Sequence, residues 1–172
     1  MRVGFVGLSA VALFAGCASA QDASPRAAAE LRKADGQTVA RATVEPSGDG
    51  VRLRIEATGL PAGTYGAHIH MTGRCDAPDF ASAGGHWNPM SRQHGSENPQ
   101  GPHMGDLPNL VVAANGTGNL SFVIPHARLR GTGDHALLDA DGAAVVVHAS
   151  PDDYLTDPSG NSGARIACGV LN

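Results

Sequence analysis

Short segments in which apolar and polar residues alternate run through most of the chain from residue 37 onward. The clearest are 37–45 (QTVARATVE) and 51–57 (VRLRIEA). Alternation with a period of two places the apolar side chains on one face of a β-strand. Turns rich in glycine and proline interrupt the pattern, and further strands are predicted at 64–71, 110–114, 119–124, 143–148 and 164–171. This arrangement predicts an all-β fold, a Greek-key β-barrel or sandwich.

Three segments do not follow the strand pattern. Residues 27–32 have helical propensity, although Gly36 follows closely and the next segments are strands. Residues 72–104 and 150–163 show no periodicity at all. Loops of this length are uncommon in a compact domain unless they are functional. We therefore expect both loops to carry functional residues.

The first twenty residues have the features of a signal peptide. Arg2 precedes an uncharged apolar run over 3–15, which is too short to span a bilayer, and small residues at 18–20 offer a cleavage site. We expect a leader at 1–20, a tether at 21–26 and one domain at 27–172. A second interpretation rests on Phe14-Ala15-Gly16-Cys17, which resembles a bacterial lipobox and would give a membrane tether through lipidated Cys17.

Both interpretations predict an exported protein, periplasmic or extracellular, and only the second adds a lipid anchor. Besides Cys17 the exported chain retains Cys75 and Cys168. In an oxidising compartment two cysteines favour one disulfide.

Composition limits the classes of partner. Hydrophobic residues make up 42% and charged residues 16%, which is typical of a folded domain. The formal charge is −4, and removing a leader that carries only Arg2 leaves 16 acidic against 11 basic residues, or −5. This sign disfavours nucleic acid and anionic membranes. The eight histidines outnumber Phe, Trp and Tyr together, which indicates a site.

The histidines are spaced as metal ligands. His68 and His70 lie two residues apart on a predicted strand, where such residues share a face about 6.5 Å apart. A single loop then holds a denser set suited to zinc, with three imidazoles and one carboxylate: His86, His94, His103 and Asp106. His148 ends an apolar run next to the second long loop.

These motifs together resemble copper,zinc superoxide dismutase of the secreted bacterial type. The resemblance rests on GAHIH, GGHWNP, the spacing H-x₇-H-x₈-H-x₂-D, VVVHASPDD and GARIACGV, and it covers residues 27–171. It implies an eight-stranded Greek-key barrel or sandwich with a long metal-binding loop and a second long active-site loop, and it implies one copper and one zinc per chain. The implied copper ligands are His68, His70, His86 and His148, and the implied zinc ligands are His86, His94, His103 and Asp106.

The resemblance also implies roles for residues around the metals. His86 would bridge the two ions, and Asp152 would orient one histidine of each metal. Arg165 would dock the anionic substrate beside copper, and Cys75 and Cys168 would form the disulfide. His126 and His135 lie outside the ligand pattern and are interpreted as structural or solvent-exposed.

The implied activity is the disproportionation of superoxide to dioxygen and hydrogen peroxide, with copper alternating between Cu(II) and Cu(I). The alternative is a copper/zinc buffer or chaperone with a dismutase-like domain. Chaperone relatives typically lose copper ligands or carry an exposed CxC pair, and this sequence keeps seven ligand positions and has no CxC. The sequence leaves a homodimer open and predicts no nucleic-acid partner.

Overall fold

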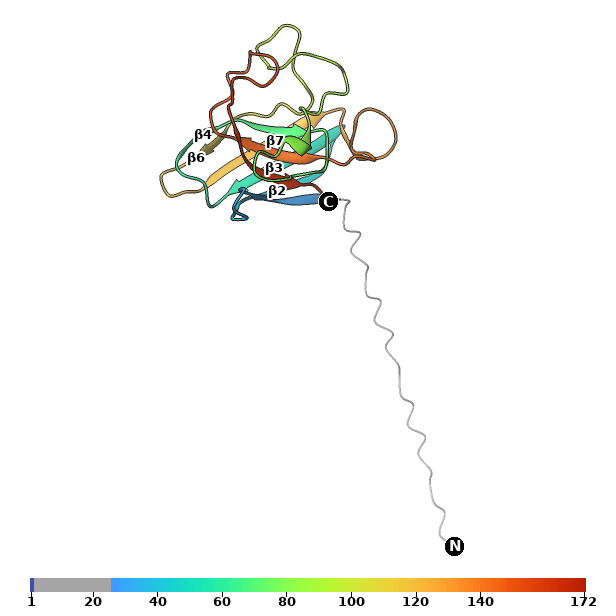
Figure 1. Cartoon of the computed structure of the whole chain (residues 1–172). Coiled ribbons are helices and arrows are strands. Elements are labelled where there is room, and N and C mark those ends of the chain that lie inside the picture. Colours follow the sequence, from blue (N-terminus) through green and yellow to red (C-terminus); the bar gives the residue numbers. More distant parts are fainter. Residues whose placement is uncertain (2–25) are drawn as a thin grey trace.

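Nine strands form one antiparallel sheet that curls into a nearly closed barrel in the computed structural model, which describes Met1 and residues 26–172 (Figure 1). The order across the sheet is β4-β6-β7-β3-β2-β1-β11-β10-β5. The bounds are β1 (Ala27–Arg32), β2 (Thr38–Ser47), β3 (Gly50–Ala57), β4 (Gly63–Tyr65), β5 (Ala67–His70), β6 (Leu110–Val112), β7 (Gly118–Pro125), β10 (Ala144–His148) and β11 (Arg165–Val170). The two short strands β8 (Arg128–Arg130) and β9 (Ala136–Leu138) pair in parallel beside it.

Gly66 joins the two ends of this strand order. It separates β4 from β5, the first and last strands across the sheet. Its carbonyl accepts a hydrogen bond from the His148 amide at 2.8 Å, and its own amide donates to the Ser150 carbonyl at 2.8 Å. A Cβ at this position would lie 2.8 Å from Cβ of Ser162, so only glycine allows this close approach where the two ends of the strand order meet.

The barrel interior follows the period-two pattern of the sequence. In β3, Val51, Leu53 and Ile55 are fully buried, whereas Arg54 and Glu56 between them are exposed. β10 is different, because all five of its residues are buried. A second apolar cluster explains this, since Phe80 and Ala83 of the first long loop cover the outer face of β10.

The all-β Greek-key prediction is confirmed, with corrections to individual elements. Residues 27–32 form a strand because they pair with β2 along their whole length, which overrides helical propensity. The predicted strand 64–71 is divided at Gly66 into β4 and β5. The pair β8 and β9 has no counterpart among the predicted strands, and it raises the strand count above eight.

Two long loops project from the same end of the barrel (Figure 1). They correspond to the aperiodic segments predicted from the sequence, 72–104 and 150–163. A disulfide between Cys75 and Cys168, with Cα atoms 5.7 Å apart, ties the first loop to β11. The predicted pairing of these two cysteines is thereby confirmed.

The predicted leader at 1–20, including Cys17, and the tether up to residue 25 lie outside the described residues, apart from Met1. Within the described part of the chain, no helix has the length and apolar character needed to cross a membrane.

Candidate metal centre

Two neighbouring strands carry three histidines of the site. β5 carries His68 and His70, and β10 ends at His148. The ladder between the strands pairs His68 with Val146 and His70 with Ala144. The three imidazoles are almost fully buried, with at most 3% of each residue exposed. We call these three residues the strand half of the site.

The first long loop supplies the rest of the cluster. It folds back onto β5 through isolated bridges that pair His68 with Asp106 and His70 with His86. As a result, the ring centroid of His86 lies 4.0 Å from that of His68 and 5.0 Å from that of His70. His86 therefore packs directly against the strand half.

Asp106 is the centre of the remaining part, which we call the loop half: His94, His103 and Asp106. Its Oδ1 lies 2.9 Å from Nδ1 of His86, 3.1 Å from Nδ1 of His103 and 3.1 Å from Nδ1 of His94. Its Oδ2 accepts the amide hydrogens of Gly95 and His103, each at 3.0 Å. One carboxylate thus gathers three imidazoles and fixes the loop backbone around them.

Two sets of side chains place their ligand atoms within 4.8 Å of one another, as a bound metal would require. One set is His68, His70, His86 and His148, and the other is His68, His86, His94 and Asp106. The first matches the expected copper set. The second differs from the expected zinc set because it contains His68 in place of His103. His103 nevertheless lies within 3.3 Å of His86, measured between the Nδ1 atoms.

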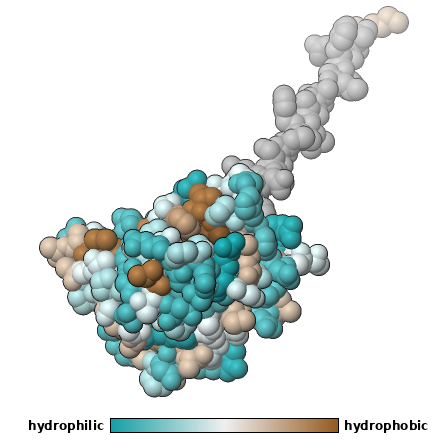
Figure 2. Space-filling view, turned by 90° about the horizontal axis from the view of Figure 1, so that it is seen from above, coloured by the Kyte–Doolittle hydropathy of each residue, from teal (hydrophilic) through white to brown (hydrophobic). Residues whose placement is uncertain are grey.

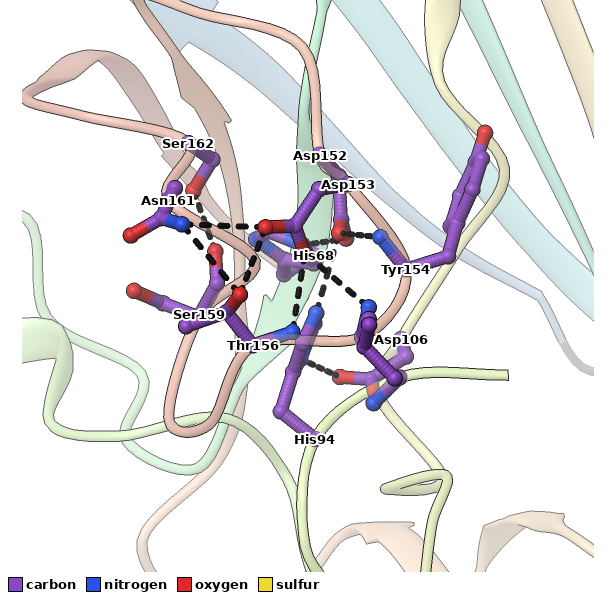
Figure 3. Close-up of polar contacts among 12 residues, drawn as sticks. His68, His94, Asp106, Asp152, Asp153, Tyr154, Thr156, Ser159, Asn161 and Ser162 are labelled. Atoms are coloured by element: carbon purple, nitrogen blue, oxygen red, sulfur yellow. Dashed lines mark hydrogen bonds and ion pairs between the residues drawn. The ribbon is translucent and has the colours of Figure 1, made fainter. Parts of the chain in front are cut away.

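The second long loop places Asp152 between the two halves (Figure 3). Its carboxylate oxygens lie 2.7 Å from Nε2 of His68 and 3.0 Å from Nε2 of His94. Gly160 passes directly over this carboxylate at a φ of 63°, and a Cβ there would lie 1.9 Å from Oδ1. Only glycine fits both the close approach and the left-handed backbone.

Sequence reasoning missed the residues that hold Asp152 and His94 in place. The Asn109 side chain accepts the Asp152 amide hydrogen at 2.8 Å and donates to the Asp152 carbonyl at 2.9 Å. The Tyr154 hydroxyl accepts the Asn109 amide hydrogen at 2.8 Å, and Asp157 accepts that of His94 at 2.6 Å. These contacts join residues that are more than 40 positions apart in the sequence, so no local motif indicates them.

In each imidazole of the first metal set, one ring nitrogen takes part in a hydrogen bond and the other is available to bind a metal. Nδ1 of His70 lies 2.9 Å from the Gly84 carbonyl, and Nδ1 of His148 lies 3.1 Å from the Gly163 carbonyl. Both bonds require Nδ1–H, so Nε2 carries the lone pair. Each residue of the first metal set has one buried nitrogen without a hydrogen-bond partner among the described residues: Nδ1 of His68 and Nε2 of His70, His86 and His148. Oriented, neutral imidazoles of this kind suit copper and zinc.

Charge distinguishes the two halves. In the protein alone, burial lowers the pKa of His68 to about 3, of His70 to about 2 and of His148 to about 4. Burial also opposes the charged form of His94, but its contacts with Asp106 and Asp152 outweigh this and raise its pKa to about 9. Burial favours a neutral Asp106, yet hydrogen bonds from the histidines hold its pKa well below the ordinary value. The loop half thus carries charge, whereas the strand half is neutral.

A cavity of about 710 Å³ gives access to the cluster, and Arg165 forms part of its wall. The guanidinium donates to the carbonyls of Phe80 and Gly84, each at 2.7 Å. The Gly84 carbonyl also lies 2.9 Å from Nδ1 of His70. Arg165 is therefore a fixed cation in the wall of the cavity that His70 also lines.

Two histidines remain outside the cluster, as the sequence predicts. His126 is exposed between β7 and β8, where Nδ1 lies 3.4 Å from the Asp49 carboxylate. His135 precedes β9 and is half-buried.

Comparisons with known proteins agree with one another. The family model "Copper/zinc superoxide dismutase (SODC)" matches residues 36–171. A copper-zinc superoxide dismutase of Aquifex aeolicus is 41% identical over 144 residues, which cover 83% of this chain and 85% of that protein. One from Caulobacter vibrioides is 44% identical over 147 residues, covering 84% of each chain. The crystal structure of a SOD-like protein from Bacillus subtilis superposes with a TM-score of 0.80 at 44% identity, covering 84% of this chain and 97% of that one.

Proposed function

The chain belongs to the copper/zinc superoxide dismutase family, and we propose that it converts two superoxide anions and two protons into dioxygen and hydrogen peroxide at the histidine cluster. The observation that carries the proposal is the convergence of four buried imidazole nitrogens without hydrogen-bond partners among the described residues, at the end of a cavity that contains one fixed arginine.

We assign copper to His68, His70, His86 and His148, and zinc to His86, His94, His103 and Asp106, with one ion of each per chain. Bound copper supplies the one-electron chemistry, whereas zinc does not change valence. In this assignment His86 would serve both ions, because its Nδ1 lies 2.9 Å from Asp106 and its buried Nε2 has no hydrogen-bond partner among the described residues. Asp152 orients His68 on the copper side and His94 on the zinc side.

The chain's own residues then have separate tasks. Arg165 holds the superoxide anion by its positive charge, because its guanidinium lines the cavity. Nε2 of His86 accepts a proton in one half-reaction and returns it to the forming peroxide in the other. In the protein alone, burial lowers the pKa of His86, which keeps the imidazole neutral and leaves a nitrogen free to accept a proton or hold a metal. The loop half keeps His86 in place while the proton moves.

Replacement of His86 provides the test. Protein reconstituted with both metals should contain one copper and one zinc per chain by elemental analysis, and rapid mixing with superoxide should give a fast second-order decay. His86→Ala should lose most of the turnover and uncouple the two metals. His126→Ala, at an exposed histidine paired only with Asp49, is the matched control and should retain both metals and activity. A protein that binds both metals but leaves superoxide untouched would instead be a metal buffer.

The disulfide and the bacterial relatives point to an exported protein. We propose the periplasm or the extracellular space as its location, with cleavage after residue 20 or lipidation at Cys17. Mass spectrometry of the mature N-terminus separates the two, because a lipidated cysteine adds the mass of its acyl chains.

A further inference from the structure

The mouth of the cavity is acidic, although superoxide is an anion. Asp134, Asp139 and Asp141 line the same cavity as Arg165 and His70. All three carboxylates belong to exposed residues, and none forms an ion pair within the part of the chain that the structure describes. Three negative charges against one positive charge attract cations and repel anions. The mouth is therefore better suited to admitting a metal ion than to steering the substrate.

A methionine lines the same cavity as these carboxylates. Met71 directly follows His70, is 51% exposed and lines the cavity. Its side chain lies against Gly84, where a Cβ would be 3.1 Å from Cγ and 3.6 Å from Sδ of the methionine. The Gly84 carbonyl is the acceptor shared by His70 and Arg165. The thioether thus lies next to the group that orients both residues.

The exposed position of Met71 leaves much of its side chain open to solvent and to dissolved ions. On the face of the molecule shown in Figure 2, hydrophilic residues predominate and hydrophobic ones are scattered. Half of Met71 remains in contact with solvent, so burial gains little there. Thioether sulfur is, however, a soft ligand that selects Cu(I) over harder cations.

Deeper in the cavity lie two imidazoles that can receive the ion. His70 and His148 line it, are 1% and 3% exposed, and each has an Nε2 without a hydrogen-bond partner among the described residues. The cavity therefore presents carboxylates and a thioether at exposed positions, and unpaired imidazole nitrogens at buried ones.

We propose that the mouth is a capture site through which copper enters the centre. Asp134, Asp139 and Asp141 concentrate the cation, and Sδ of Met71 binds it as Cu(I) before it passes to Nε2 of His70 and His148. The transfer is an exchange of ligands on Cu(I), so no electron moves and no bond within the protein breaks. The inference rests on the proposed function, because it takes the histidine cluster as the destination of copper.

The test follows copper loading of the zinc-containing, copper-free mature protein by rapid mixing. Cu(I), supplied anaerobically as its acetonitrile complex, is followed with a chromophoric Cu(I) chelator, and Cu(II) sulfate is followed by its visible absorption. Met71→Leu should load Cu(I) about tenfold more slowly while loading Cu(II) at the wild-type rate. Met90→Leu is the matched control, because Met90 is 49% exposed but does not line the cavity, and it should load both ions normally.

The carboxylates are tested separately with Asp139→Asn/Asp141→Asn. This variant should load both ions several-fold more slowly at low salt, with a smaller difference at about 150 mM, where the screening length is about 8 Å. Glu56→Gln, an acidic residue on the exposed face of β3, should change neither rate.

Wild-type Cu(I) loading in Met71→Leu, or equal slowing in Met90→Leu, would overturn the role of the thioether. Wild-type loading in the double aspartate variant at low salt would overturn the role of the carboxylates. The proposed function fails in a different way, namely when fully loaded wild-type protein does not consume superoxide. Loading that depends on Met71 would stand in that case.

Discussion

The strand half and the loop half of the histidine cluster are built by different means. His68 and His70 take their positions from the hydrogen-bonded ladder between β5 and β10, which also forms the barrel wall. His94 and His103 belong to a loop without regular structure, and the carboxylates of Asp106 and Asp152 hold them in place. The barrel therefore fixes the backbone of the strand half, and the loops contribute only the hydrogen bonds that orient its rings, whereas the position of the loop half depends on a few side-chain contacts.

The same difference sets the charge of each half. The strand half is buried away from carboxylates except at His68, so its imidazoles resist protonation. The loop half surrounds His94 with Asp106 and Asp152, and this histidine is held protonated in the protein alone. Under the proposed assignment, copper would therefore occupy neutral surroundings and zinc charged ones.

The largest expected difference between the two halves is in how acid changes their contribution to the stability of the protein. The pKa values of His68, His70 and His148 lie at about 3, 2 and 4, against about 6.5 in an unfolded chain. Between the folded and unfolded pKa values the unfolded chain binds more protons than the folded chain. The contribution of these three histidines to the free energy of unfolding is therefore complete above pH 6.5 and is lost as the pH falls. From pH 6.5 to 5 the free energy of unfolding of the metal-free protein should fall by up to about 5 kcal/mol.

His94 contributes in the opposite direction. Its pKa is raised to about 9, so its contribution is present below pH 6.5 and is lost as the pH rises through 9. Urea unfolding followed by circular dichroism between pH 5 and 9 measures both effects. The control variant His126→Ala should lose stability between pH 6.5 and 5 to the same extent as the wild type. A wild-type stability that did not change between pH 6.5 and 5 would contradict the neutral state of the strand-half histidines.

The disulfide should matter more for the loop half than for the strand half. Cys75 and Cys168 are 93 residues apart, and closing a loop of about that length corresponds to about 4–5 kcal/mol of chain entropy. Cys75→Ser/Cys168→Ser should lose about this much stability and release zinc to a chelator faster than copper. Urea titration and metal release by mass spectrometry provide the two readings. Equal acceleration of both metals would show that the bond supports the whole cluster.

The strand half and the loop half also differ in how much of their structure the sequence predicts. Val51, Leu53 and Ile55 alternate with charged residues, so the barrel strand they form is visible in the sequence. Histidine spacing likewise identifies the candidate ligands, because His68 and His70 share a strand face. Residues 27–32 form a strand despite their helical propensity, because pairing with a neighbouring strand decides their conformation and propensity reports only the local preference.

The supports of the loop half could not be predicted. Asn109 holds Asp152 through two hydrogen bonds across 43 positions of sequence. Nothing in the residues around Asn109 distinguishes it from an ordinary polar residue before a strand. Contacts between two irregular loops depend on how both loops fold, and this information is not carried by spacing or periodicity.

Asp152 links the halves, and its loss should weaken both unequally. Asp152→Asn keeps the size of the side chain but removes the charge that faces His68 and His94. Loss of such an orienting carboxylate typically costs 10–100-fold in metal affinity, or about 1.4–2.7 kcal/mol. We expect zinc affinity to fall more than copper affinity, because the barrel still positions His68.

Competition with chelators of known affinity measures both constants for Asp152→Asn. The neighbouring Asp153→Asn is the matched control, since Asp153 bonds Thr156 and Asn161 and has no contact with a histidine. A larger loss for copper than for zinc would reverse the comparison between the halves.

Arg165 offers the smallest effect and acts on the strand half alone. Its guanidinium lines the cavity beside His70 and is bonded only to backbone carbonyls, so Arg165→Ala should leave both metals bound. Loss of one charge–anion contact in a hydrated channel should lower kcat/KM by about 5–30-fold, or about 1–2 kcal/mol. Arg74→Ala removes an exposed arginine that pairs with Asp76, and it should remain near the wild-type rate.

The salt dependence of the rate tests the role of Arg165 further, because six aspartates and no lysine or arginine lie between 131 and 164. Raising the ionic strength from about 10 to 150 mM shortens the screening length from about 30 to about 8 Å. This weakens the repulsion by the acidic mouth together with the attraction by Arg165, so the wild-type rate should change by less than about twofold. In Arg165→Ala only the repulsion remains, and the rate should rise with salt. A steep fall of the wild-type rate in pulse radiolysis would show that a positive channel outweighs the aspartates.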